Sequence, residues 1–182
     1  PELTAEAARV ASLGAGAKVL KTFSHQLTEE DIAEIETIRP EIFLLTGGID
    51  GGNRECIEHN AHMLARCGVR FPVVIAGNRS STSVCAKALE GWEVFPCPNV
   101  MPKLGTLDIE PVQKVIRDLF LQRIVHAKGL SHWEQLVDGI LMPTPSALMD
   151  AMQLLSKGTK KTRGLGELVA VDLGGATTDI YS

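Results

Sequence analysis

Two glycine-rich stretches hold the residues of this 182-residue chain that could do chemistry. The first is Thr46–Asn53, TGGIDGGN, which lies between an apolar run and a helical pattern. Backbone N–H groups at a strand-to-helix turn can hold an anion, and glycines admit a ligand without a Cβ in its way. The stretch matches neither the G-x-G-x-x-G nor the Walker A pattern. Contact with a ligand or partner and a plain turn capped by Asp50 or Asn53 are both open.

A polar edge is predicted around this first stretch. The carboxyl ends of parallel strands open on one edge of a sheet, so Thr46–Asn53 should lie beside Gly77–Ser81. Ser24 and His25 should join them from a third strand end, giving one concave polar surface. No base, nucleophile and orienting group occur together in it, so the prediction is binding and not catalysis. The candidate ligand or partner contacts are Thr46, Gly47, Gly48, Asp50, Gly51, Gly52, Asn53, Asn78 and Arg79.

The second stretch is Gly166–Ser182, GELVAVDLGGATTDIYS. Its pattern predicts a buried strand over Leu168–Leu173 and a turn at Gly174 and Gly175. Thr177–Tyr181 is the predicted returning strand. An aspartate at the strand end could hold Mg²⁺, and glycine N–H groups and threonine hydroxyls could hold phosphate. An ordinary Gly-Gly hairpin is the alternative, although a turn alone does not require the flanking carboxylates.

Two further groups favour structural interpretations. His59 and His62 form H-x-x-H on a predicted helix, whose period turns both away from the buried side. A solvated helix face is therefore favoured, and no structural metal is expected. A basic loop in the last third of the chain is interpreted as a solvated, mobile connection, with phosphate contact as the alternative. Its cations are Lys157, Lys160, Lys161 and Arg163.

Composition excludes several classes of protein. Hydrophobic residues are 45% and charged residues 22% of the chain, an ordinary globular balance. The net charge of -4 gives no electrostatic footprint for nucleic acid or anionic lipid, and no apolar run reaches the roughly 18 residues that span a bilayer. No C-x-x-C pair occurs, so reduced thiols of a cytoplasmic protein are expected rather than zinc or disulfide chemistry. The cysteines are Cys56, Cys67, Cys85 and Cys97.

Strand-like runs alternate with amphipathic helices in the first half of the chain. Strands are expected at Ala17–Phe23, Glu41–Thr46, Pro72–Ala76 and Trp92–Phe95. Helices are expected from Thr4 to about Gly14, at Glu29–Ile38 with Thr28 as its cap, at Asn53–Cys67 and at Ser81–Glu90. This alternation predicts an α/β fold, a parallel Rossmann-like or flavodoxin-like sheet with flanking helices.

The pattern changes after Pro96 to a helical segment. A long helix is expected at Ile109–Ala127, with one apolar stripe. Ser131 and Glu134 form a capping box for a short helix, and a further helix should run from Thr144 to Lys157. The C-terminal β-hairpin completes the predicted fold. The residues of the stripe are Val112, Ile116, Leu119 and Phe120.

The sequence VDLGGATTDI resembles the second phosphate-binding hairpin of the actin, heat-shock chaperone and sugar kinase superfamily. Members of that superfamily use D-x-G-G-x-T-x-D to hold nucleotide phosphates and metal. The resemblance implies that Asp172 lies near the metal and that the turn after it contacts phosphate. Alanine at position 176 replaces a glycine that often follows the pair. The implied contacts are Asp172, Gly174, Gly175, Ala176, Thr177, Thr178 and Asp179.

A closer resemblance covers nearly the whole chain. The segments LTAEAARVASLGAGAKV, LLTGGIDGGN, VVIAGN, PTPSALMDA and VDLGGATTDIYS are similar to the MutL/GlmL family, which is unrelated to the mismatch-repair protein also called MutL. Its members are associated with adenosylcobalamin-dependent glutamate mutase. The resemblance implies an ATP-dependent reactivating chaperone that releases damaged cobalamin. The implied cofactors are ATP and Mg²⁺, and the implied partner is glutamate mutase or another adenosylcobalamin-dependent mutase subunit.

Family members extend beyond both ends of these motifs, so we expect an internal fragment. Residues 1–16 would end a first actin-like lobe, 17–97 form the parallel α/β domain, 98–165 the helical segment and basic loop, and 166–182 the start of a second lobe. The full-length protein is expected to be an ATPase and the fragment inactive alone. The alternative is a stand-alone α/β enzyme domain that binds a small ligand or nucleotide at the glycine-rich edge. The D-x-H-x-x-G motif of cobalamin-binding domains does not occur.

Overall fold

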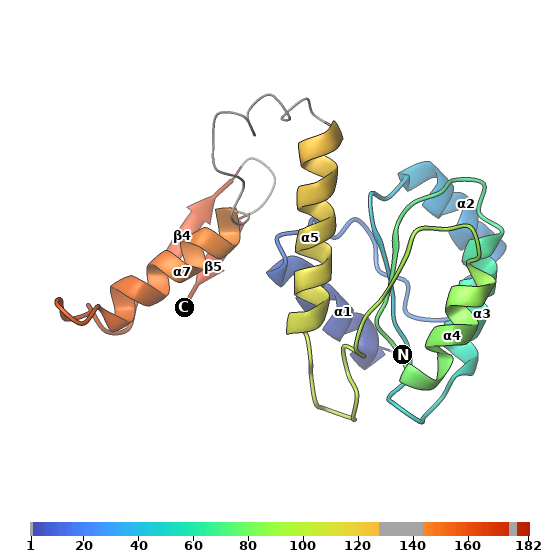
Figure 1. Ribbon diagram of the computed structural model, residues 1–182, viewed down its shortest axis with the longest axis horizontal. Coiled ribbons are helices and arrows are strands. Elements are labelled where there is room, and N and C mark those ends of the chain that lie inside the picture. The colour runs from blue at the N-terminus through green and yellow to red at the C-terminus, as the bar shows by residue number, and fades with distance from the viewer. Residues whose placement is uncertain (1, 128–143, 175–177) are drawn as a thin grey trace. The chain divides into compact units, whose positions relative to one another are not determined.

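The computed structural model describes residues 2–127, 144–174 and 178–182 (Figure 1). The chain divides into two compact units, Pro1–Leu119 (unit 1) and Phe120–Ser182 (unit 2). Unit 1 holds α1 (Glu2–Gly14), α2 (Glu29–Ile38), β1 (Phe43–Leu45), α3 (Glu55–Ala65), β2 (Val73–Ile75), the 3-10 turn η1 (Arg79–Ser81), α4 (Thr82–Ala88), β3 (Val94–Pro96) and most of α5 (Glu110–Ala127). Unit 2 adds α7 (Thr144–Lys157), β4 (Ala170–Leu173) and β5 (Thr178–Tyr181).

The sheet of unit 1 is parallel, as the alternation of strands and helices predicted. Its strand order is β1-β2-β3, and the register places Leu45 beside Ile75 and Ile75 beside Pro96. Helices α3 and α4 provide the two crossover connections. Because all strands run the same way, the loops after Leu45, Ile75 and Pro96 emerge at one edge.

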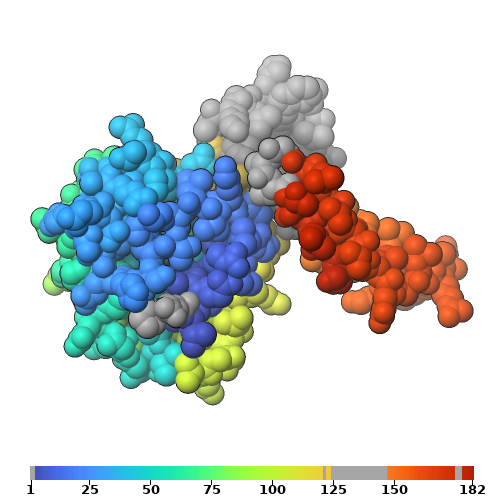
Figure 2. All heavy atoms as spheres, turned by 180° about the vertical axis from the view of Figure 1, so that it is seen from behind, coloured from blue at the N-terminus to red at the C-terminus, as the bar shows by residue number. Residues whose placement is uncertain are grey.

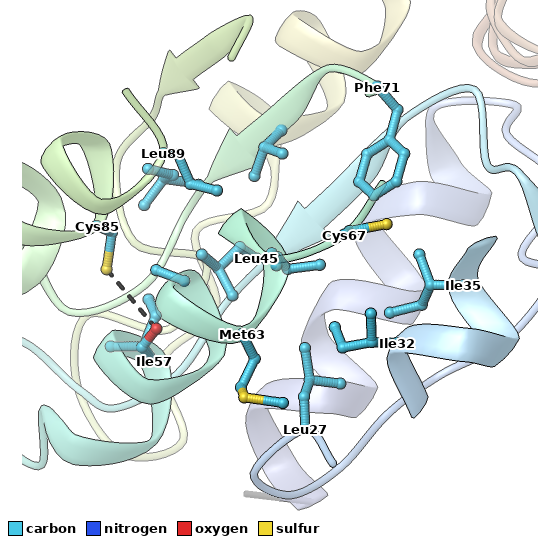
Figure 3. Close-up of a cluster of buried hydrophobic side chains, with 14 residues drawn as sticks. Leu27, Ile32, Ile35, Leu45, Ile57, Met63, Cys67, Phe71, Cys85 and Leu89 are labelled. Atoms are coloured by element: carbon cyan, nitrogen blue, oxygen red, sulfur yellow. Dashed lines mark hydrogen bonds between the residues drawn. The ribbon is translucent and has the colours of Figure 1, made fainter. Parts of the chain in front are cut away.

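Helices cover both faces of this sheet. On one face, Leu45 of β1 and Ile75 of β2 pack against α2, α3 and α4 (Figure 3). On the other face, Leu44 and Ala76 pack against α1 and α5. Neighbouring residues of a strand point to opposite faces, so the short apolar runs must be buried on both sides, which is why they show no polar alternation.

Local sequence signals set the bounds of α2 as predicted. The Thr28 hydroxyl accepts a hydrogen bond from the Asp31 backbone N–H, and the Asp31 carboxylate accepts one from the Thr28 backbone N–H. This capping box satisfies two N–H groups that the first turn leaves free. The helix ends at Arg39, which adopts the left-handed conformation with φ of 50° immediately before Pro40.

The strand predicted at Ala17–Phe23 is wrong. The segment runs along the surface of unit 1 without ladder hydrogen bonds (Figure 2). Leu20 is 55% exposed, and Lys21 forms an ion pair with Glu34 at 2.7 Å. Ala17 and Phe23, at the two ends of the segment, still pack against the core. The strand-like run at residues 17–23 therefore belongs to a chain segment that lies on a packed surface without joining the sheet.

Two helix details also differ from the predictions. Helix α1 begins at Glu2, so Thr4 is buried within the first turn instead of capping it. On α5, Val112, Ile116 and Leu119 are buried but Phe120 is 36% exposed. Phe120 lies one residue beyond Leu119, and a step of about 100° around the helix axis turns it off the buried stripe. Ser131 and Glu134, the predicted capping box, lie outside the described residues.

Unit 2 contains the predicted C-terminal hairpin. Strands β4 and β5 are antiparallel, with Val171 opposite Ile180 and Leu173 opposite Thr178. The expectation of a buried first strand is wrong for the described part of the chain, where Val171 is 58% and Leu173 80% exposed. Helix α7 begins at Thr144 and ends at Lys157 as predicted. It packs beside β5 and so covers only one face of the hairpin.

The loop after α7 is structured, contrary to the expectation of a mobile connection. Gly158 and Arg163 form an antiparallel bridge, and the Thr159 N–H donates to the Thr162 carbonyl at 2.8 Å. The cations of the loop are nevertheless exposed, as expected. Among the helices of the described residues, none is long and apolar enough to cross a bilayer.

Candidate functional site

The glycine-rich loop and the η1 segment meet at the carboxyl edge of the unit 1 sheet, as the sequence predicted. Asn78, which is fully buried, joins them. Its carboxamide oxygen accepts from the N–H groups of Gly51 at 3.2 Å and Ser80 at 3.0 Å. Its amide nitrogen donates to the carbonyls of Gly52 at 3.0 Å and Asn53 at 3.2 Å. One side chain thus makes four bonds to the backbone of two loops.

A third loop joins this edge through Asp50. One carboxylate oxygen of Asp50 accepts from the Arg79 N–H at 2.9 Å and from the Asn99 amide nitrogen at 2.9 Å. The Asn99 amide also donates to the Gly48 carbonyl at 3.0 Å, and the Asp50 N–H donates to the Pro102 carbonyl at 3.0 Å. Loops 46–53, 78–81 and 99–102 therefore form one hydrogen-bonded group, here called the carboxyl edge.

The third contributor to the carboxyl edge differs from the prediction. Ser24 and His25 were expected there, but residues 17–23 do not form a strand and so do not deliver them to this edge. The carbonyl of His25 instead accepts from the Asn60 amide at 3.1 Å, beside α3. Asn99 contributes the third group of the carboxyl edge because it follows β3, which is the third strand of the sheet.

Packing explains most of the glycines in this edge. Gly48 has φ of +70°, and a Cβ on it would collide with the Asn53 carbonyl oxygen. A Cβ on Gly77 would lie 2.7 Å from the Gly47 nitrogen and would collide with the Ile57 side chain. Gly51 differs, because a Cβ there would meet nothing within 4 Å. The plain-turn interpretation therefore accounts for Gly47, Gly48 and Gly77 by packing, and for Gly51 by its φ of +73°, which favours glycine.

Sequence reasoning missed a charged group that lies beside the carboxyl edge. The Glu58 carboxylate accepts from the Ser81 hydroxyl at 2.8 Å and from the Arg54 guanidinium at 2.9 Å. Both bonds lower the pKa of Glu58 below its usual value, and the bond from Ser81 has the larger effect. Arg54, the residue before α3, and Glu58 in its first turn are spaced i,i+4, and this spacing was the available signal.

The chemistry open to the carboxyl edge is binding. Its amides and Asp50 bond to the loops themselves. The Ser81 hydroxyl does lie beside the Glu58 carboxylate, but Ser81 is fully buried and so faces no substrate. Arg79 and Asn53 remain exposed at its surface. An edge held by its own bonds keeps its shape before a partner arrives, which reduces the entropy that binding costs.

The histidine pair is not simply a solvated face. His62 is exposed as expected, but His59 is half-buried and its Nε2 lies 2.9 Å from the Leu27 carbonyl oxygen. Neighbouring Asn60 is buried and accepts from the Leu27 N–H at 2.8 Å. These contacts give α3 a second polar side that holds the preceding segment. Within the described residues, no group of three or more His, Cys, Asp or Glu is placed to hold a metal ion.

All four cysteines are free thiols. Cys67 and Cys85 are buried, and Cys56 and Cys97 are half-buried. Burial raises the pKa of Cys85 to about 11, and burial together with Asp108 raises that of Cys97 to about 11. The Cys85 thiol donates to the Ile57 carbonyl at 3.7 Å (Figure 3). Such thiols are protonated at neutral pH, which fits the predicted role in packing.

The hairpin of unit 2 brings its two aspartates together. Asp172 and Asp179 are direct cross-strand partners, and both are half-buried. Paired residues of an antiparallel ladder share one face, with Cβ atoms about 5 Å apart. Carboxylates so placed repel each other unless a cation or donor lies between them, and carboxylate oxygen is the ligand that Mg²⁺ prefers. Gly174 is exposed, and residues 175–177 lie outside the described part of the chain.

A cavity of about 550 Å³, wide open to solvent, lies between α7 and β4. Asp172 lines its β4 side, and its other walls are apolar. The Tyr181 hydroxyl is buried on the same strand face as Asp172 and has no hydrogen-bond partner among the described residues. Burial first, and then Asp179 and Asp172, raise the pKa of this phenol. The remaining lining residues are Ala147, Leu148, Ala151, Met152, Ala170 and Val171.

The fold and these two sites define a two-part protein, a parallel α/β unit joined to a unit with a carboxylate-bearing glycine hairpin. The chain belongs to the MutL protein family, whose sequence profile matches residues 1–182. It is 50% identical over 184 residues to Protein MutL of Clostridium tetanomorphum. No solved structure matches the chain.

The match covers all of this chain but only 40% of the Clostridium tetanomorphum protein. The chain therefore spans less than half the length of its curated relative. It includes both glycine-rich stretches, so the carboxyl edge and the hairpin belong to one family segment.

Proposed function

We propose that the chain is an internal module of an ATP-dependent reactivating factor for adenosylcobalamin-dependent glutamate mutase. In this proposal the hairpin of unit 2 contributes to a site for the phosphates and Mg²⁺ of ATP. Unit 1 supplies a binding surface for the mutase, or couples mutase binding to the nucleotide. Membership of the MutL family supports the proposal, as do the two sites described above.

The pairing of Asp172 with Asp179 is the observation that carries the nucleotide part. Two half-buried carboxylates on one strand face offer oxygen ligands of the kind that Mg²⁺ prefers. When bound, ATP would supply the phosphates that such a cation bridges. Asp172 and Asp179 would hold the metal, and the turn that begins at Gly174 would offer N–H groups to phosphate.

The carboxyl edge is assigned to protein recognition rather than to enzymatic chemistry. The internal bonds of Asn78 and Asp50 favour a preformed surface over an adaptable pocket. The alternative, a stand-alone α/β enzyme domain with its site at this edge, would need acid, base or nucleophile groups that face a ligand. We therefore favour a cytoplasmic binding module whose partner is a mutase subunit and neither nucleic acid nor membrane.

Titration of Mg·ATP into the full-length protein tests the nucleotide part. Asp172→Asn should weaken binding at least about tenfold, since a charge-assisted contact to the metal is lost. Asp150→Asn is the matched control, because Asp150 is an exposed aspartate of α7 in the same unit. Unchanged affinity in Asp172→Asn would show that the hairpin does not form the site.

Reactivation of cobalamin-inactivated glutamate mutase tests the recognition part. Arg79→Glu reverses an exposed charge of the carboxyl edge without removing its backbone bond to Asp50. This variant of the full-length protein should bind Mg·ATP normally but reactivate the mutase poorly. Arg9→Glu, on the exposed side of α1, is the charge-matched control. Full reactivation by Arg79→Glu would remove the carboxyl edge from the interface.

A further inference from the structure

A second charged feature, separate from the hairpin and the carboxyl edge, follows α7. The seven residues Lys157–Arg163, here called the basic turn, contain four cations and no carboxylate. The chain has 18 Lys and Arg against 22 Asp and Glu, so the remainder has 14 cations against 22 acids, a net charge of -8. The basic turn is therefore a cluster of positive charge in a chain whose other residues carry a net negative charge.

Hydrogen bonds within the basic turn fix its backbone. The Thr159 hydroxyl accepts from the N–H groups of Lys161 and Thr162, both at 3.1 Å. The Thr159 N–H donates to the Thr162 carbonyl at 2.8 Å. Gly158 and Arg163 close the turn as an antiparallel bridge. The backbone that carries the cations is therefore ordered before any partner binds.

The basic turn is also anchored to the end of α7. The Gly158 N–H donates to the Leu154 carbonyl at 2.7 Å, and the Leu165 N–H donates to the Leu155 carbonyl at 2.9 Å. The Ser156 hydroxyl donates to the Gly166 carbonyl at 2.7 Å. Gly158 has φ of +80°, and a Cβ there would collide with the backbone of the returning chain. Helix α7 thus presents the cations on a fixed support.

No internal need explains four cations at this place. All four are exposed, and no ion pair within the described part of the chain involves any of them. Lys157 lies in the last turn of α7, where a cation stabilises the negative end of the helix dipole. That accounts for one cation and leaves the other three without an internal role.

The basic turn lies too far from the hairpin turn to share its phosphate site. Asp172 faces the N-terminal half of α7, where it shares the cavity with Leu148. The basic turn follows the C-terminal end of α7 (Figure 1). Leu148 and Lys157 are nine residues apart on α7, which is about 14 Å along the helix axis at about 1.5 Å per residue. The cations would therefore meet a different anion from any bound at Asp172.

We propose that the basic turn docks onto an acidic surface of a partner protein. Cations spread along an exposed turn fit an extended array of carboxylates, and electrostatic complementarity of this kind speeds and orients association. The turn has no aromatic residue on which a base could stack, which argues against single-stranded nucleic acid. This proposal does not depend on nucleotide binding by the hairpin.

The test measures binding of fluorescent poly-L-glutamate by anisotropy. The whole chain is compared with K157Q/K160Q/K161Q and with the control K18Q/K87Q/K114Q, which removes three exposed lysines of unit 1. The basic-turn variant should bind about tenfold more weakly at low salt, since three short-range charge contacts are lost. The control should bind almost as the unchanged chain does. K157R/K160R/K161R should retain binding, because it keeps the charges.

Three results would overturn the proposal. The first is equal loss in both glutamine variants, which would indicate a response to net charge alone. The second is preferential binding of heparin or duplex DNA over poly-L-glutamate at about 150 mM salt, which would indicate a nucleic-acid or polysaccharide site. The third is unchanged binding by the basic-turn variant. Far-ultraviolet circular dichroism of each variant confirms that a loss does not come from unfolding.

Discussion

At the scale of single residues, Asn78 contributes most to the shape of the carboxyl edge. Replacing it with alanine would leave two part-buried backbone N–H groups and two part-buried carbonyls without their partner. We expect Asn78→Ala to lower the free energy of unfolding by about 2–4 kcal/mol. Asn53→Ala is the control, since its side-chain oxygen only accepts from the Cys56 N–H at 3.5 Å. Its cost should stay below about 1 kcal/mol.

Urea unfolding of the two asparagine variants, followed by circular dichroism, checks this difference. Equal stability of Asn78→Ala and the unchanged chain would mean that water replaces the four bonds without cost. The carboxyl edge would then be an adaptable loop group and not a preformed surface.

Glu58 makes the stability of unit 1 depend on pH. Hydrogen bonds from Ser81 and Arg54 lower its pKa in the folded state. A carboxyl group with a lowered folded pKa stabilises the fold above its unfolded pKa of about 4.3, and this contribution is lost as the pH falls through the folded value. Glu58→Gln should therefore be less stable than the unchanged chain at pH 7, and the gap should close toward pH 3.

Thermal melts between pH 3 and pH 7 measure that gap. Glu55→Gln, an exposed glutamate one turn earlier on α3, is the control. A gap between Glu58→Gln and the unchanged chain that stays constant with pH would contradict the prediction. The loss would then come from packing and not from charge.

The limits of sequence reasoning are visible in the same residues. Asn78 was predicted at the carboxyl edge because it directly follows a strongly apolar strand. Asn99 follows β3 in the same way, but it was not predicted at the carboxyl edge. Ser24 and His25 were predicted there instead, because residues 17–23 were interpreted as a strand. A strand-like apolar run shows that a segment packs against the core, and only the neighbours in space decide whether it joins a sheet.

At the scale of elements, helix bounds were the most predictable feature. The capping box of Thr28 and Asp31 identifies the start of α2 from the sequence, and Pro40 identifies its end. Strands β1 and β2 followed from short apolar runs. The exposure of β4 could not be predicted, because an apolar run indicates burial without indicating what buries it.

The exposed face of β4 gives a prediction at this scale. Val171→Thr should change the stability of this chain by no more than about 0.5 kcal/mol, since Val171 is 58% exposed. Val74→Thr, which places a hydroxyl in the core of β2, should cost about 1–3 kcal/mol. In the full-length protein we expect Val171→Thr to become destabilising as well, because a two-stranded hairpin requires further packing to be stable. Differential scanning calorimetry of both variants in both proteins measures this.

A neutral Val171→Thr in the full-length protein would contradict that expectation. The exposed face of the hairpin, with Leu173 and Ile180, would then be solvated in the intact molecule. It would be a candidate surface for contact with another chain.

At the scale of the whole molecule, the two units differ in how much of the apolar surface of their sheets is buried. Unit 1 buries both faces of its sheet, and its edge loops bond to one another. The hairpin of unit 2 packs on α7 with one face and exposes valine and leucine on the other. We therefore expect unit 1 to fold and bind by itself. We expect the hairpin of unit 2 to need a further packing partner for its exposed face.

The last prediction follows from this difference: the 182-residue chain alone should hydrolyse no ATP, whereas the full-length protein should bind and turn it over. Phosphoryl transfer depends on charges and donors fixed around the phosphates from several sides. This chain offers one hairpin, with Asp172 and Asp179 on one face. The measurement is phosphate release by both proteins, each beside its Asp172→Ala variant. Turnover by the 182-residue chain that disappears in Asp172→Ala would show that one hairpin is sufficient, because a contaminating ATPase would not respond to that substitution.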